Sequence, residues 1–165
     1  MNYIFKEEGK FKYVEIGEGR PIIILHGLMG GLSNFNGVTE FFNQNGYKVV
    51  LPELPLYSLP LLSTNVKSFA EYLKDFIDFL GFNDVILLGN SLGGHIGLLY
   101  TKLYPAKVKA LVITGSSGLY ESAMGSGYTK RSDYEVMKSK VQEVFYDPEV
   151  ASKEMVDEVF ASVND

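Results

Sequence analysis

Five consecutive residues, 89–93, read Gly-Asn-Ser-Leu-Gly, the G-x-S-x-G pattern in which a serine hydroxyl can act as a nucleophile. The segment Asp84 to Leu88 before them predicts a buried strand, and the Leu- and Ile-rich segment after them predicts a helix up to Pro105. A chain that reverses sharply at Ser91 leaves no room for side chains two residues away, which accounts for both glycines. The turn would lift the hydroxyl above a sheet edge, at the positive end of a helix dipole. The pattern predicts a nucleophile elbow, with a purely structural turn as the alternative.

A second group of glycines follows another expected strand. The segment His26-Gly27-Leu28-Met29-Gly30-Gly31 comes after the β-branched run Ile22 to Leu25. Glycines at a strand end let backbone N–H groups turn toward a site and stabilise the negative oxygen of a tetrahedral intermediate. We assign the two donors to the amides of Leu28 and Leu92. The residues expected to contact a small-molecule substrate are Gly27, Met29 and Asn90. Taken alone, these glycines are equally consistent with a tight strand-to-helix turn.

The elements that must position these residues alternate between strand and helix. Strands are predicted at residues 11–16, 22–25, 48–51, 84–88 and 108–114, with residues 3–6 as a hairpin partner of the first. Helices are predicted from a cap at Ser33 to Gly46, from Val66 to Gly81, and after Ser91. This alternation predicts an α/β fold, a mostly parallel sheet with helices on both faces. Residues 1–118 would form this core, and residues 119–165 contain two amphipathic helices and no further strand.

Composition excludes several classes of function. The chain has 165 residues, of which 46% are hydrophobic, and a formal net charge of −5, which disfavours nucleic acid and anionic membranes as partners. It has no cysteine, so a disulfide scaffold, a thiolate metal site and a cysteine nucleophile are excluded. The N-terminal residues lack the apolar core of a signal peptide, and the longest aliphatic run is too short to cross a bilayer. We expect a soluble, cytoplasmic protein without a metal or organic cofactor.

With both glycine motifs in place, residues 11–118 resemble the α/β-hydrolase superfamily, in its serine-nucleophile, HG-motif branch of small bacterial hydrolases with a helical cap. In that family the serine follows the fifth strand and the oxyanion loop follows the third. The run Gly89 to Gly94 is similar to that of carbon–carbon bond hydrolases of aromatic degradation and of esterase-like groups. Serine at position 91 argues against epoxide hydrolases and haloalkane dehalogenases, which use aspartate. The loop Glu53 to Ser58 lacks the glycines common in the family, so the pocket wall there is expected to differ.

The resemblance implies a catalytic histidine and acid that the sequence does not supply. In the family these follow later strands, in the order Ser, Asp, His, and here no histidine follows His95. His95 is expected to lie in the helix–sheet interface and His26 to orient the oxyanion loop. Lys130 and Arg131 are interpreted as a solvated patch and Glu53 as a loop carboxylate, with substrate binding as the alternative for Glu53. The chain is therefore expected to be truncated after about the sixth strand, at the start of the cap, and to be inactive alone.

Three interpretations follow. The first is the N-terminal part of a serine hydrolase, esterase-like or cleaving carbon–carbon bonds, that acts on a small carbonyl substrate. The second is a non-catalytic domain of the same fold that binds a small apolar ligand. The third is completion by another chain, because the predicted strand 108–114 would be an exposed apolar sheet edge that invites pairing or self-association.

Overall fold

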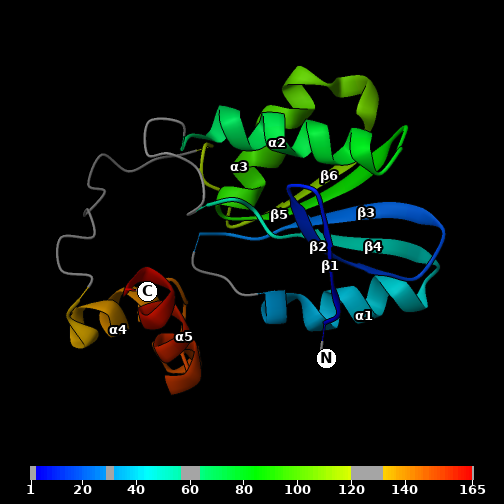
Figure 1. Cartoon of the computed structure of the whole chain (residues 1–165). Coiled ribbons are helices and arrows are strands. Elements are labelled where there is room, and N and C mark those ends of the chain that lie inside the picture. Colours follow the sequence, from blue (N-terminus) through cyan, green and yellow to red (C-terminus); the bar gives the residue numbers. More distant parts are fainter. Residues whose placement is uncertain (1–2, 29–31, 57–63, 120–131, 165) are drawn as a thin grey trace. The chain divides into compact units, whose positions relative to one another are not determined.

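The computed structural model describes residues 3–28, 32–56, 64–119 and 132–164 (Figure 1). These residues fall into two compact units, Met1–Tyr120 and Glu121–Asp165. In the first unit the described residues form a six-stranded sheet with the order β1-β2-β4-β3-β5-β6. The strands are β1 (Phe5–Glu8), β2 (Phe11–Ile16), β3 (Arg20–Leu25), β4 (Tyr47–Pro52), β5 (Val85–Asn90) and β6 (Val108–Thr114).

The sheet is mixed, with its parallel part at the centre. β1, β2 and β4 pair antiparallel, whereas β4, β3, β5 and β6 run parallel. In β3 the side chains of Ile22 and Ile24 pack on one face of the sheet and those of Ile23 and Leu25 on the other, all fully buried. Apolar runs buried on both faces are typical of parallel strands. The predicted α/β class with a mostly parallel sheet is confirmed.

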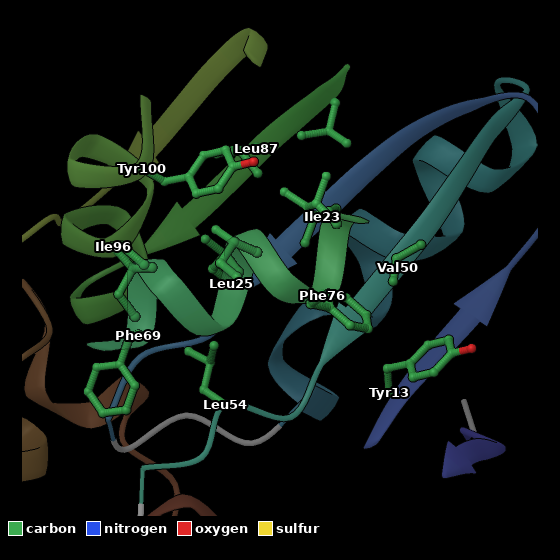
Figure 2. Close-up of a cluster of buried hydrophobic side chains, with 14 of the residues drawn as sticks. Tyr13, Ile23, Leu25, Val50, Leu54, Phe69, Phe76, Leu87, Ile96 and Tyr100 are labelled. Atoms are coloured by element: carbon green, nitrogen blue, oxygen red, sulfur yellow. The ribbon is translucent and has the colours of Figure 1, made fainter. Parts of the chain in front are cut away.

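Helices cover both faces of this sheet (Figure 1). On one face lie α2 (Val66–Phe79) and α3 (Leu92–Leu103), and on the other lies α1 (Asn36–Gln44) after a short 3-10 turn, η1 (Leu32–Phe35). Figure 2 shows the larger core cluster, in which Phe76 of α2 and Ile96 of α3 pack with Leu25 and Leu87 of the sheet. Because α3 is anchored in this core, its first turn is fixed relative to the ends of β3 and β5.

The residues that were predicted to begin or end helices do so in the structure, with one exception. Gly46 and Gly81 follow α1 and α2 with φ of +77° and +69°, a conformation that glycine adopts at low cost. Asn65 caps α2, since its side chain accepts a hydrogen bond from the Ser68 amide at 3.0 Å. The predicted cap at Ser33 is wrong: Ser33 lies inside η1, and Phe35 occupies the cap position of α1.

β6 forms an edge of the sheet. Within the described residues it pairs only with β5, and a further 3-10 turn, η3 (Pro105–Lys107), leads into it. Four of its seven residues are exposed, and Val112 keeps 44% of its surface accessible. The expected exposure of this apolar strand is confirmed, whereas the expected self-association through it stays a prediction.

The described residues of the second unit form a pair of helices, α4 (Tyr134–Gln142) and α5 (Lys153–Asn164), with η4 (Pro148–Val150) between them. Met137 of α4 and Val156 of α5 are buried. The Tyr134 hydroxyl donates a hydrogen bond to Asp157 at 2.6 Å, and its ring packs edge-on against Phe160. Two helices were predicted here; that they begin a cap stays a prediction.

Candidate active site

Ser91 lies between the end of β5 and the start of α3, in a backbone conformation that serine rarely adopts. Its φ is +53° and its ψ is −118°, and it is the single non-glycine residue with positive φ in the described part of the chain. Such conformations cost about 1–3 kcal/mol and persist only where the surroundings impose them. A relaxed structural turn, the alternative weighed from the sequence, does not have this geometry.

The two glycines around Ser91 are required by close backbone approaches. A Cβ atom on Gly89 would lie 2.6 Å from the carbonyl carbon of Gly93 and from the amide nitrogen of Gly94. A Cβ atom on Gly93 would lie 2.5 Å from the carbonyl carbon of Leu25 and 2.8 Å from the carbonyl oxygen of His26. The first contact is the sharp reversal that the sequence predicted. The second shows, in addition, that the first turn of α3 rests directly on the backbone of β3.

Residues at and just after the end of β6 hold the backbone of Ser91 by hydrogen bonds. The Ser91 amide donates to the carbonyl oxygen of Thr114 at 3.0 Å, and the Ser117 amide donates to the carbonyl oxygen of Ser91 at 3.3 Å. The Asn90 side-chain amide also donates to Thr114, at 3.0 Å to its hydroxyl and 3.1 Å to its carbonyl. Sequence reasoning missed Thr114 and Ser117. The expected contact of Asn90 with substrate stays a prediction. In the structure its side-chain nitrogen is hydrogen bonded to Thr114.

The backbone that follows β3 also lies close to Ser91. A Cβ atom on Gly27 would lie 3.1 Å from Ser91 Cβ and 3.5 Å from the Asn90 carbonyl oxygen, so only glycine allows this approach without adjustment. Leu28 follows directly, with 41% of its surface accessible. Leu92 is the first residue of α3, and the first four amides of a helix have no partner within it. The Ser91 side chain does not cap them. Gly27, Leu28, Ser91 and Leu92 thus lie at one edge of the sheet, and the expected role of the Leu28 and Leu92 amides as oxyanion donors stays a prediction.

The remaining predicted contact residue, Met29, lies outside the described residues, as do Tyr57, Ser58, Lys130 and Arg131. Glu53 lies at the surface, where its carboxylate pairs with the Lys12 ammonium at 2.8 Å. It lines a shallow pocket of about 220 Å³ with Lys10, Leu54 and Tyr72 among others.

In the described part of the chain no group of acidic and histidine side chains could hold a metal ion.

The two histidines have different environments, and neither is hydrogen bonded to the Ser91 side chain in the described residues. His26 is buried, and both of its ring nitrogens are occupied by backbone groups. Burial lowers the pKa of His26, against smaller opposite effects of the Gly27 carbonyl and Glu53. His95 is half-buried, its Nδ1 lies 3.5 Å from Ser117 Oγ, and its ring packs against Gly118, in the turn after β6. The expected role of His26 in orienting its loop stays a prediction.

Comparison with known proteins assigns the family. Residues 20–152 match the family model described as alpha/beta hydrolase fold. The chain belongs to the alpha/beta hydrolase fold family. The six-stranded mixed sheet with helices on both faces is the architecture of this family.

Several relatives of this chain are named as hydrolases of 2-hydroxy-6-oxo compounds. Over 111 residues it is 34% identical to 2-hydroxy-6-oxononadienedioate/2-hydroxy-6-oxononatrienedioate hydrolase 1 of Pseudomonas putida, covering 62% of this chain and 39% of that protein. Over 162 residues it is 28% identical to 2-hydroxy-6-oxo-6-phenylhexa-2,4-dienoate hydrolase of Comamonas testosteroni, covering 87% and 56%. The chain thus spans about two-fifths to just over half of the length of these relatives.

A solved structure is more similar still. The alpha/beta hydrolase enzyme MGS-MChE2, from the metagenome of sediments of the lagoon of Mar Chica, Morocco, is 68% identical to this chain. The match has a TM-score of 0.69 and covers 72% of this chain and 54% of that protein. Among the described residues of this chain, no helix is long and apolar enough for a membrane span.

Proposed function

We propose that this chain carries the nucleophile and the oxyanion donors of a serine hydrolase that cleaves a bond next to a ketone or ester carbonyl. The observation that carries the proposal is the backbone of Ser91, with a φ of +53° between β5 and α3. Strain of this kind gathers at functional sites because the surrounding structure must maintain it. A serine in a plain strand-to-helix connection would relax to negative φ.

The proposed reaction uses groups at the sheet edge. The Ser91 hydroxyl oxygen attacks the carbonyl carbon while its proton passes to a histidine, and the carbonyl oxygen becomes an anion that the Leu28 and Leu92 amides stabilise. When the intermediate collapses, the bond to the leaving group breaks and the leaving group takes that proton. Water then releases the acyl group from Ser91 by the same steps. The complete enzyme would supply the histidine and its partner acid, because both ring nitrogens of His26 are bonded to the backbone and no hydrogen bond joins His95 to the Ser91 side chain in the described residues.

The relatives favour a 2-hydroxy-6-oxodienoate as substrate. The two curated relatives described above are named as hydrolases of such compounds. In the alternative order of events, the same site activates water for attack on the 6-oxo group. A purified complete protein should therefore hydrolyse these conjugated dienoates with a higher kcat/KM than p-nitrophenyl esters. The opposite preference would assign it to the esterase-like group.

The nucleophile is tested by labelling the complete protein with a fluorophosphonate probe and mapping the adduct by mass spectrometry. We expect the label on Ser91, and no label on Ser91→Ala, with Ser117→Ala as the matched control. Label on another residue, or full activity of Ser91→Ala, would refute the assignment. Ser91 in the 165-residue chain alone should react no faster than an ordinary serine, since no hydrogen bond joins either histidine to the Ser91 side chain in the described residues. Absence of any adduct in the complete protein would favour a non-catalytic domain that binds a small ligand.

A further inference from the structure

His95 lies on α3 one turn after Ser91, and both its backbone and its side chain take part in the hydrogen bonds around Ser91. The His95 amide donates to the carbonyl oxygen of Ser91 at 3.2 Å, and the same oxygen accepts a hydrogen bond from the Ser117 amide at 3.3 Å. The His95 Nδ1 lies 3.5 Å from the Ser117 hydroxyl oxygen, which is a long hydrogen bond. These three residues therefore form a closed ring of hydrogen bonds that joins α3 to the turn after β6.

The His95 ring also packs directly on the next residue of that turn. A Cβ atom on Gly118 would lie 2.5 Å from Cδ2 of the ring and 2.6 Å from its Cγ and its Nε2. Gly118 has a φ of +84°, in the region that glycine adopts at low cost. The imidazole thus occupies the space that a side chain at position 118 would need, and only glycine allows this approach.

A second contact holds the same turn against α3. A Cβ atom on Gly94 would lie 2.6 Å from the hydroxyl oxygen of Ser116, and that hydroxyl donates to the carbonyl oxygen of Ser117 at 2.8 Å. In the described part of the chain β6 pairs with β5 alone. The turn that follows β6 therefore depends on α3 for its position, and His95 supplies the side chain for that contact.

We propose that His95 is a positioning residue for the nucleophile: its side chain holds residues 116–118 against α3, which keeps the Ser117 amide on the carbonyl of Ser91. A residue with the φ of Ser91 stays in that conformation only where its surroundings impose it. Loss of the imidazole should therefore lower the reactivity of Ser91 and leave substrate binding little changed. This catalytic consequence rests on the proposed function, whereas the packing of the ring is a property of this chain.

The packing is tested by urea unfolding of the 165-residue chain with Gly118→Ala, alone and combined with His95→Ala. Gly46→Ala is the matched control, because Gly46 has a similar φ of +77° and a Cβ atom there would meet no atom within 4 Å. We expect Gly118→Ala to lower the urea midpoint more than Gly46→Ala does when His95 is present, and equally when His95 is alanine. A difference that persists without the ring, or equal midpoints in both backgrounds, would overturn the proposal.

The positioning role is tested in the complete enzyme with His95→Asn and His95→Leu. The two side chains have similar size, but only asparagine carries a polar atom where Nδ1 lies and can keep the hydrogen bond to Ser117. We expect His95→Leu to lower kcat and the rate of fluorophosphonate labelling by about 10-fold, below the loss of about 10²-fold that a misplacement of about 1 Å can cause. KM should stay nearly unchanged, and His95→Asn should recover most of both rates. Circular dichroism at the assay temperature confirms that each variant is folded.

The hydroxyl of Ser117 completes the test. Ser117→Ala keeps the amide that bonds Ser91, so the label should still be found on Ser91 but should form more slowly, and adding His95→Leu should cause no further loss. Unchanged rates in the folded His95 variants, equal losses with asparagine and leucine, or a change confined to KM would each refute the positioning role. Failure of Ser91 to react in the wild-type enzyme would instead refute the proposed function, while the urea experiment would still decide whether the ring packs on Gly118.

Discussion

Replacement of Gly93 by alanine tests whether the elbow is held as the structure shows. The added methyl carbon would lie 2.5 Å from the carbonyl carbon of Leu25 and 2.8 Å from the carbonyl oxygen of His26. Both neighbours are backbone atoms at the end of β3, a central strand that is paired with β4 and β5. They cannot rotate away as a flexible side chain would. The first turn of α3 must therefore move off the sheet, against the packing of Ile96 and Tyr100.

Gly37→Ala supplies the matched control, and the difference between the two variants gives the magnitude. Gly37 is the second residue of α1, as Gly93 is of α3, and a Cβ atom on it would meet no atom within 4 Å. Alanine gains up to about 1 kcal/mol over glycine in a helix, and this gain cancels between two equivalent positions. What remains is the cost of the forced contact, about 1–3 kcal/mol for overpacking in a well-packed interior.

The assay is urea unfolding followed by far-ultraviolet circular dichroism, with the slope m compared among wild type and both variants. We expect Gly37→Ala to unfold at the same or higher urea concentration than wild type. Gly93→Ala should unfold with a free energy lower than that of Gly37→Ala by at least about 1 kcal/mol. Equal free energies of unfolding for the two variants would refute the close approach of α3 to β3, and with it the geometry assigned to the elbow.

Three further predictions concern Ser91, Tyr100 and His26. The free energy of unfolding of Ser91→Gly should exceed that of Ser91→Ala by about 1 kcal/mol, because glycine adopts positive φ without strain. Equal values from urea unfolding would show that the backbone at position 91 is not strained. Tyr100→Phe should leave the melting temperature unchanged or raise it, since the buried hydroxyl has no hydrogen-bond partner among the described residues; a clear fall would show that a bound group satisfies it. Because the pKa of His26 is lowered by folding, the unfolded chain binds the extra proton, and the free energy of unfolding should fall below about pH 6.5 by at most about 1.4 kcal/mol per pH unit. Comparison with His26→Gln across pH isolates this contribution, and parallel pH dependences would refute it.

The sequence predicted the parts of the site that depend on neighbours along the chain. The glycines around Ser91 are needed within a single turn, so their spacing alone indicated the elbow. The runs of β-branched residues in β3 and β4 indicated a parallel sheet, because a continuous apolar run within one strand indicates burial on both faces. The position of β2 beside β4, by contrast, depends on which strands pair, and hydrophobic periodicity carries no information about pairing.

The residues that hold the site in place could not be predicted in this way. Thr114 contacts Asn90 because β5 and β6 pair in a register that sets these two residues side by side. Leu54 meets His26 because β3 and β4 pair in parallel, which sets their carboxyl ends side by side. Each contact joins residues more than 20 positions apart. A polar residue at the end of a predicted strand next to the nucleophile's strand is the one signal that could have drawn attention to Thr114.

These contacts explain how a strained residue can stay in place on a small sheet. The amide and the carbonyl of Ser91 are both bonded to the turn at residues 114–117, so relaxation of φ would break two hydrogen bonds at once. Those bonds come from the end of β6, the strand whose outer edge is exposed in the described part of the chain. Edge strands open more readily than central ones because fewer contacts oppose their opening. The conformation of Ser91 therefore depends on how firmly β6 is held, whereas the backbone at Gly27 is held by His26 and by the interior of the sheet.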